Sequence, residues 1–218
     1  MNVARFKQLP ILGILRGIGP ADLEPLLATV ESAGLKAIEI TMNTEGAAQL
    51  IRRAVALSKK RLMIGAGTVR DIKSLKIALD AGATFIVMPV LVGDVMKYCV
   101  KQRIPAFPGA LTPQEIHTAW LAGATMVKVF PSNFFGPEYF REIKGPFNDV
   151  ELLACGGVTS RNLRSYFACG AGAVSFGASV FKKEWLSQKD FQKIGRSIKE
   201  YIREFTALKT ASPGSGAT

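Results

Sequence analysis

The sequence has little histidine, no cysteine framework and no long apolar run. Only one of its 218 residues, His117, is a histidine, which leaves too few imidazoles for a multi-histidine zinc site or a metal-dependent epimerase site. Cys99, Cys155 and Cys169 follow no disulfide or metal-site spacing. No stretch reaches the ~18 apolar residues of a membrane span, and Arg16 interrupts the short N-terminal apolar segment. We therefore expect a cytoplasmic protein that binds no metal and no membrane.

Acidic residues are outnumbered by basic ones, with 17 Asp and Glu against 28 Lys and Arg and a net charge of +11. The basic residues gather at Arg52–Arg61 and along Lys182–Lys209, but neither segment carries the interleaved aromatics of a single-strand-binding surface. This pattern indicates a solvated surface, or a field that favours small anions such as phosphorylated metabolites. We expect no nucleic-acid partner.

Short apolar segments alternate regularly with amphipathic ones. Near-continuous apolar strands separated by helices are typical of a parallel sheet covered on its faces, and eight such units predict a single (β/α)8 TIM barrel. We expect the barrel to span residues 1–208 and residues 209–218 to form a flexible tail. The predicted strands are Ile11–Leu15, Ala37–Met42, Leu62–Gly67, Phe85–Pro89, Ile104–Pro108, Met126–Phe130, Glu151–Cys155 and Ala173–Phe176.

The boundaries of the helices carry their own signals. Thr112 followed by Pro113 and Glu115 predicts a helix start, because threonine caps the first turn and proline fits its first position. Glycine after alanine, as at Gly34, is the signal for a helix end. The last helix is predicted over Gln188–Phe205.

In this fold functional side chains lie at the carboxyl ends of the strands. Lys128 lies within the apolar sixth predicted strand, where an unpaired charge is costly and burial favours the neutral amine. A neutral amine can attack a carbonyl carbon and form a Schiff base. Glu39, between two isoleucines of the second strand, is expected to have a raised pKa and to shuttle protons. The alternatives are a buried ion pair between the two, or a Lys128 side chain whose aliphatic stem carries its charge outward to solvent.

Glycine-rich turns follow the seventh and eighth predicted strands. Gly156, Gly157 and Gly177 stand where barrels commonly bind phosphate through backbone N–H groups, although plain turn geometry would also explain them. His117 is expected to be a surface or packing residue, and Cys155 a packing thiol, since no histidine is near to activate it. Residues 133–136 are expected to form an active-site loop.

Several segments occur in register with these strands and together carry a resemblance. The chain resembles the class I aldolases that act on 2-keto-3-deoxy-6-phosphogluconate, 2-keto-3-deoxy-6-phosphogalactonate and 4-hydroxy-2-oxoglutarate, from about Leu9 to Phe181. The segments are Ile14-Leu15-Arg16-Gly17, Ile38-Glu39-Ile40-Thr41, Gly65-Ala66-Gly67-Thr68-Val69, Phe107-Pro108-Gly109, Val127-Lys128-Val129-Phe130-Pro131 and Gly156-Gly157-Val158.

The resemblance implies a role for each of these positions. Lys128 would form the Schiff base with the keto carbon of a 2-keto acid, with no cofactor, and Glu39 would move protons. Arg16 and Thr68, with backbone near Pro89, would hold the carboxylate. The remaining implied contacts are Phe130 against the imine carbons and Gly156, Gly157 and Gly177 around the phosphate. The likeness also implies a homotrimer.

Two positions depart from the family pattern. Asn43 stands where some gluconate-type members have arginine, which favours the galactonate branch or members that bind the carboxylate with the first-strand arginine, here Arg16. Ala178 stands where a serine usually follows the last strand, so Ser179 is the hydroxyl left to contact phosphate. We predict cleavage of a 2-keto-3-deoxy-6-phospho sugar acid to pyruvate and glyceraldehyde 3-phosphate. The alternatives are 4-hydroxy-2-oxoglutarate as substrate, or a non-catalytic barrel that binds phosphorylated metabolites.

Overall fold

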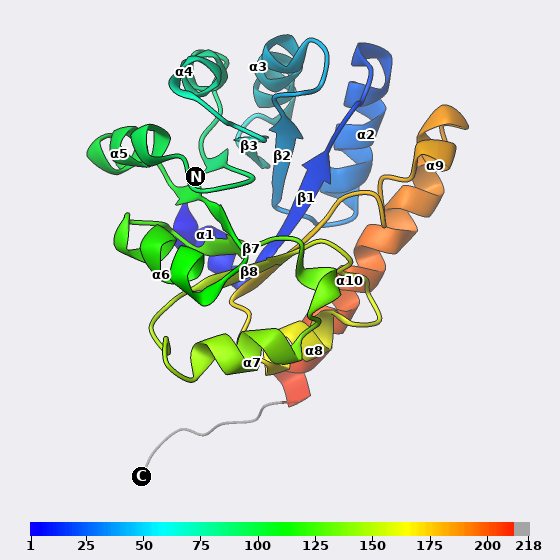
Figure 1. Ribbon diagram of the computed structural model, residues 1–218. Coiled ribbons are helices and arrows are strands. Elements are labelled where there is room, and N and C mark those ends of the chain that lie inside the picture. The colour runs from blue at the N-terminus through cyan, green and yellow to red at the C-terminus, as the bar shows by residue number, and fades with distance from the viewer. Residues whose placement is uncertain (212–218) are drawn as a thin grey trace.

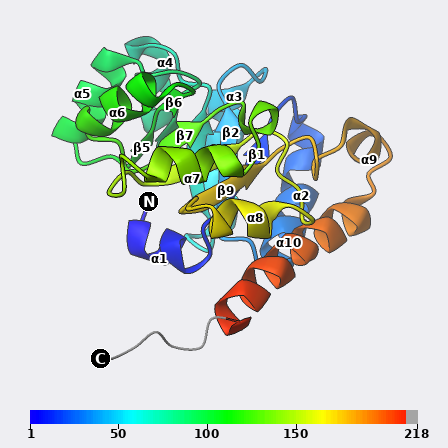
Figure 2. The same ribbon diagram turned by 60° about the horizontal axis from the view of Figure 1, so that its bottom comes forward.

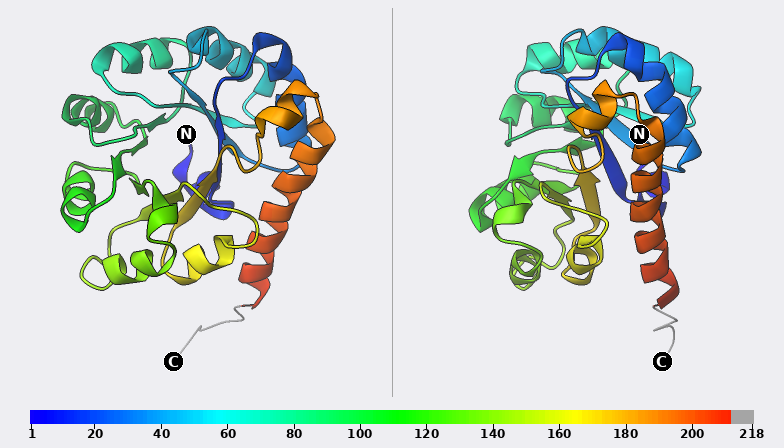
Figure 3. Two further views of the ribbon diagram at one scale, coloured as in Figure 1. Left: turned by 45° about the vertical axis from the view of Figure 1, so that its right-hand side comes forward. Right: turned by 90° about the vertical axis from the view of Figure 1, so that its right-hand side faces the viewer.

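A ring of helices surrounds a closed parallel sheet in the computed structural model, which describes residues 1–211 (Figures 1 and 3). Every predicted strand position holds a strand, which confirms the barrel. The strands are β1 (Ile11–Leu15), β2 (Ala37–Thr41), β3 (Met63–Gly67), β4 (Ile86–Val87), β5 (Ala106–Phe107), β6 (Gly109–Ala110), β7 (Val127–Val129), β8 (Leu152–Cys155) and β9 (Ala173–Phe176).

The ring closes through one strand that is divided in two. Within residues 1–211 the sheet order runs β5-β4-β3-β2-β1-β9-β8-β7-β6, and all pairs are parallel. Pro108 separates β5, which pairs with β4, from β6, which pairs with β7. Proline has no N–H to donate to a ladder, but its carbonyl accepts a 2.9 Å bond from the Lys128 N–H. Because β5 and β6 are the two halves of one divided strand, the nine short segments form an eight-stranded barrel.

The outer helices begin where their caps predict. In α6, the Thr112 hydroxyl accepts from the Glu115 N–H and the Glu115 carboxylate accepts from the Thr112 N–H, which forms the capping box. Pro20 opens α2 as its first residue. The outer helices are α2 (Pro20–Ser32), α3 (Ala47–Ser58), α4 (Ile72–Asp80), α5 (Gly93–Lys101), α6 (Pro113–Leu121), α7 (Glu138–Lys144), α8 (Leu163–Ala168) and α10 (Phe191–Ala211), with a 3₁₀ turn, η1, at Ser132–Phe134.

A further short helix, α1 (Val3–Gln8), closes the amino-terminal end of the barrel, and the sequence analysis did not predict it. Phe6 is fully buried in the barrel interior, and its ring meets the Phe107 ring edge-on at 6.0 Å between centroids. Asn2 caps the helix by accepting from the Arg5 N–H. Because an aromatic ring fills this end of the barrel, we expect a ligand to enter at the carboxyl end of the strands.

The C-terminal helix is longer than predicted. It begins at Phe191 and continues through Ala211, packed against α2 and α8 (Figure 2). The ammonium group of Lys209 donates to the Gln8 carbonyl at 2.8 Å, so residues 209–211 belong to the helix. The predicted tail was wrong for these three residues, and its other part lies outside the described residues. Among the helices of residues 1–211, none combines the length and apolarity that a membrane span needs.

Candidate active site

Lys128 lies on β7, enclosed by neighbouring strands. Its backbone registers with Gly109 of β6 on one side and Leu153 of β8 on the other. The residue is 8% exposed, and its ammonium nitrogen lies 5.3 Å from the centroid of the Phe130 ring. Within residues 1–211 no carboxylate lies within 4 Å of this nitrogen. A buried amine without an ion-pair partner is suited to act as a nucleophile.

Glu39 lies on β2 and is 1% exposed. Its Oε2 atom is buried and has no hydrogen-bond partner in residues 1–211. Desolvation raises the pKa of this carboxyl, and the nearby charges of Lys128 and Arg16 partly oppose the rise. The raised pKa follows the sequence prediction. The two groups are therefore electrostatic neighbours without the direct ion pair that was one alternative.

Room for Glu39 comes from glycine in the adjacent strand. A side-chain carbon at Gly67 of β3 would overlap the Oε1 atom of Glu39. Two residues earlier on the same face, a carbon at Gly65 would overlap the ring of Phe85. The Gly-Ala-Gly of β3 thus leaves one space for an aromatic ring of the core and the next for the carboxyl. In the sequence these glycines are part of a predicted strand and of the resemblance, and neither indicates what they accommodate.

Arg16 and Thr68, which the resemblance implied as carboxylate-binding residues, are hydrogen-bonded to each other. The Arg16 Nη2 atom donates to the Thr68 hydroxyl at 3.3 Å. Thr68 has a φ of 57°, in the left-handed region that non-glycine residues seldom occupy. Thr44, which the sequence analysis missed, accepts from the Gly17 N–H at 3.0 Å and bonds the Thr41 hydroxyl at 2.9 Å. These bonds fix the loop that presents Arg16.

Pro89 and Phe130 lie on a shared cavity of about 340 Å³. Gly109 also lines this cavity, and a side-chain carbon at Gly109 would overlap the Pro89 carbonyl. The Phe130 ring is exposed at the mouth, above Lys128. By contrast Asn43, the departure from the gluconate pattern, is exposed on the loop between β2 and α3.

The turn after β8 has its carbonyl groups occupied and its N–H groups free. Ser132 of η1 donates to the Gly156 carbonyl at 2.7 Å, and Asn162 donates to the Gly157 carbonyl at 3.0 Å. Both glycines have positive φ, 98° and 71°. In residues 1–211 the N–H groups of Gly156 and Gly157 donate no hydrogen bond. Free N–H groups in a left-handed turn form an anion-binding concavity.

The turn after β9 resembles the turn after β8. The sequence left the Ser179 hydroxyl to contact phosphate, but in the structure this hydroxyl contacts protein groups. The Gly177 carbonyl accepts from the N–H groups of Val180 and Phe181, and the Gly177 and Ala178 N–H groups donate no bond within residues 1–211. Ser179 donates to the Val158 carbonyl at 3.2 Å and lies 3.0 Å from the Tyr201 hydroxyl. Its hydroxyl thus ties this turn to the first.

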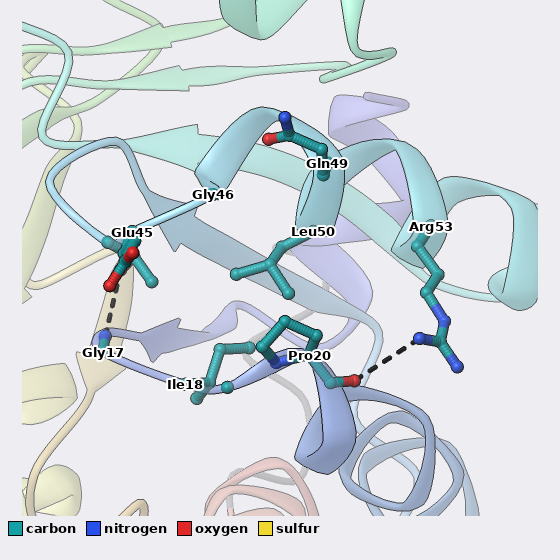
Figure 4. A pocket seen from close by; sticks show the side chains of 10 residues that line it. Gly17, Ile18, Pro20, Glu45, Gly46, Gln49, Leu50 and Arg53 are labelled. Atoms are coloured by element: carbon teal, nitrogen blue, oxygen red, sulfur yellow. Dashed lines mark hydrogen bonds between the residues drawn. The ribbon is translucent and has the colours of Figure 1, made fainter.

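A cavity of about 710 Å³ lies beside this centre, between the loops after β1 and β2. In Figure 4 the Arg53 guanidinium turns to the Pro20 carbonyl. A third cavity, of about 550 Å³, is lined by Arg16, Gly177 and Ala178. In the described part of the chain no cluster of His, Cys, Asp or Glu could hold a metal ion. The imidazole ring of His117 stacks on the Phe147 ring, at 5.1 Å between ring centroids.

Comparison with known proteins gives one consistent family. A family model described as KDPG and KHG aldolase matches residues 3–197. The chain is 31% identical over 195 residues to the 2-dehydro-3-deoxy-6-phosphogalactonate aldolase of Escherichia coli K12, covering 89% of this chain and 95% of the relative. It is 32% identical over 200 residues to the 2-dehydro-3-deoxy-phosphogluconate aldolase of Pseudomonas aeruginosa, covering 90% and 88%. A solved structure described as "Native KDPGal structure" has a TM-score of 0.87 and 28% identity, covering 93% of this chain and 97% of that one.

Proposed function

The chain belongs to the KDPG and KHG aldolase family, and we propose that it cleaves a 2-keto-3-deoxy-6-phospho sugar acid through an imine on Lys128. The products are pyruvate and glyceraldehyde 3-phosphate. The enzyme is a lyase of the class I, Schiff-base type. The observation that carries the assignment of residues is the pair of buried groups without a direct partner, Lys128 on β7 and Glu39 on β2.

The reaction follows from these two groups. The Lys128 amine attacks the C2 keto carbon, and the carbinolamine loses water to give a protonated imine. The C3–C4 bond then breaks, its electron pair moves into the imine to form an enamine, and the C4 hydroxyl proton passes to a base. The enamine takes a proton at C3 and hydrolysis releases pyruvate. Glu39 would move these protons, because it is buried beside the charges of Lys128 and Arg16 and desolvation raises the pKa of its carboxyl.

The remaining residues hold the ends of the substrate. Arg16 and Thr68, which are hydrogen-bonded to each other, would bind the carboxylate together with backbone near Pro89. Phe130 would pack against the imine carbons, since its ring lies beside the lysine nitrogen. The free N–H groups at Gly156, Gly157 and Gly177 would bind the phosphate. Ser179 would support this site by joining the two turns.

A second substrate is favoured by one position. With Ala178 in place of a hydroxyl, 4-hydroxy-2-oxoglutarate, which has no phosphate, becomes an alternative that yields pyruvate and glyoxylate. Cleavage rates with the two substrates decide between them, because only one of them carries a phosphate that the turns after β8 and β9 could bind. Activity in excess EDTA tests independence from metal.

A homotrimer is the proposed assembly, in keeping with the family likeness. Val100 on α5 and Leu121 on α6 expose 51% and 71% of their surface, as expected where a second subunit covers them. Sedimentation of the full chain tests this. The cytoplasm is the proposed compartment, which suits three cysteines that are all buried and unpaired.

Borohydride reduction in the presence of pyruvate tests the mechanism. A stable pyruvyl adduct that peptide mapping places on Lys128 supports the imine, and Lys128→Ala is the control that should remain unlabelled. A folded protein that gives no adduct would instead support the non-catalytic barrel that binds phosphorylated metabolites, with Lys128 in a structural role.

A further inference from the structure

Part of the lining of the cavity of about 550 Å³ comes from residues outside the family motifs. Its floor is the turn after β9, where the N–H groups of Gly177 and Ala178 are free within residues 1–211. Arg16 lines one side. Another part of the lining comes from α9 (Lys183–Ser187), a short helix that follows this turn and that the sequence did not predict. Lys183 is the basic residue that α9 contributes to the lining.

Two adjacent lysines of this segment have different surroundings. The Lys182 ammonium group lies 4.3 Å from the centroid of the Trp185 ring, in a cation–π contact, and Lys182 does not line the cavity. Lys183 does line it, is exposed, and has no carboxylate within 4 Å among residues 1–211. One lysine is therefore held against an aromatic ring while the next is available to a ligand.

The charges around the cavity favour an anion. Arg16 and Lys183 each contribute a positive charge, Asp22 is the carboxylate in the lining, and the free N–H groups add partial positive charge at the floor. A phosphate monoester carries close to two negative charges at neutral pH and has three acceptor oxygens. A lysine can reach such a group because its charge stands on a flexible four-carbon stem.

We propose that Lys183 binds the substrate phosphate from α9 and supplies the side-chain contact that Ala178 lacks. Without Lys183, the turn would offer the phosphate backbone N–H groups only. The Ser179 hydroxyl already hydrogen-bonds the Val158 carbonyl and the Tyr201 hydroxyl. The ammonium group of Lys183 adds a charge-assisted contact to the same oxygens. Lys183 is thus a specificity-determining residue that separates phosphorylated from unphosphorylated 2-keto acids, and its role in turnover rests on the proposed function.

The test compares Lys183→Gln with Lys182→Gln in the full chain. The KM for the phosphorylated sugar acid, relative to that for its dephosphorylated analogue, should rise about 10-fold in Lys183→Gln, the loss expected for one partly exposed charge-assisted contact. The same ratio should stay at the wild-type value in Lys182→Gln. An unchanged ratio in Lys183→Gln, or equal rises in both variants, overturns the proposal.

A second measurement separates this proposal from the proposed function. Inorganic phosphate is titrated by calorimetry into wild type and both variants, and we expect weaker binding in Lys183→Gln alone. If the wild type traps no pyruvate, the proposed aldolase function fails, but this titration still decides whether Lys183 binds phosphate. Adding Ala178→Ser to Lys183→Gln should restore part of the lost affinity for phosphate. If Lys183→Gln binds phosphate as tightly as the wild type, the proposal is contradicted.

Discussion

The proposed imine centre and the proposed anion-binding turns lie at the same end of the barrel but use different parts of the chain. Lys128 and Glu39 would act through side chains that are almost fully buried, so their positions depend on the space that the neighbouring strands leave. The turns after β8 and β9 would act through backbone N–H groups, and their backbone is held in place by hydrogen bonds from Ser132, Asn162 and Ser179. Chemistry requires a particular functional group, whereas anion recognition requires a particular backbone path. Substitutions should therefore change kcat at the first and KM at the second.

The strongest test of this division is Lys128→Ala. We expect kcat to fall by about 10⁴-fold or more, because no other group can form the imine. The fold should survive, since the change removes a buried cation that has no ion-pair partner within 4 Å in residues 1–211. Steady-state kinetics and thermal unfolding measure the two effects. Substantial residual turnover would remove Lys128 from the mechanism.

A glycine pair in β3 tests the space around Glu39. In Gly67→Ala the new methyl group overlaps Glu39, so the carboxyl must move, and we expect kcat to fall by about 10²-fold, the usual scale of a displaced proton carrier. Gly65→Ala is the matched control, because its methyl group overlaps Phe85 instead. Both variants should lose about 1–3 kcal/mol of stability through overpacking. Equal losses of kcat would show that general distortion, and not Glu39, is responsible.

The turn after β8 should respond mainly in KM. In Gly157→Ala a methyl group would overlap the Asn133 side chain, at a φ of 71° that alanine rarely adopts. We expect KM for phosphorylated substrate to rise about 10-fold through loss of one N–H contact, with a much smaller change in kcat. Gly93→Ala, where the added carbon meets nothing within 4 Å, is the control. A kcat loss larger than the KM rise would break the division between the two regions.

Burial of Glu39 also makes a prediction about pH and stability. Desolvation raises the pKa of Glu39 above its ordinary value of 4.5. Between pH 4.5 and the raised pKa of the folded state, the folded protein therefore binds more protons than the unfolded chain. Stability therefore falls as pH rises from 4.5 through the raised folded pKa. Glu39→Gln should be more stable than wild type at neutral pH, and the difference should shrink as pH falls to 4.5. Thermal unfolding across this range measures it; a constant difference would mean that Glu39 titrates normally.

The smallest expected effect concerns Ala178. Ala178 is exposed on the turn that lines the cavity of about 550 Å³, so Ala178→Ser adds a hydroxyl near the free N–H groups. We expect KM for phosphorylated substrate to fall a few-fold, the worth of about one ordinary hydrogen bond. The KM for 4-hydroxy-2-oxoglutarate is the internal control and should not change. Equal changes for both substrates would place the new hydroxyl away from the phosphate.

The sequence by itself determined the barrel and the residues at its open end. Apolar strands and the Thr112–Glu115 cap are local patterns, so they are readable without knowledge of the neighbours. Because all strands are parallel, Lys128 and Glu39 had to lie toward the same end of the sheet. Their residue types then indicated a nucleophile and a proton carrier.

Only the tertiary structure decided which groups meet. Whether Glu39 forms an ion pair depends on where the strands place its oxygens, and Gly67 holds that space from another strand. The aromatic plug at Phe6 arises because the closed barrel leaves a hole that an apolar ring fills. Lys182 and Lys183 are indistinguishable as neighbours in sequence, and only the folding of α9 over the turn after β9 gives them different surroundings. Such contacts join residues far apart in the chain, and local patterns do not encode them.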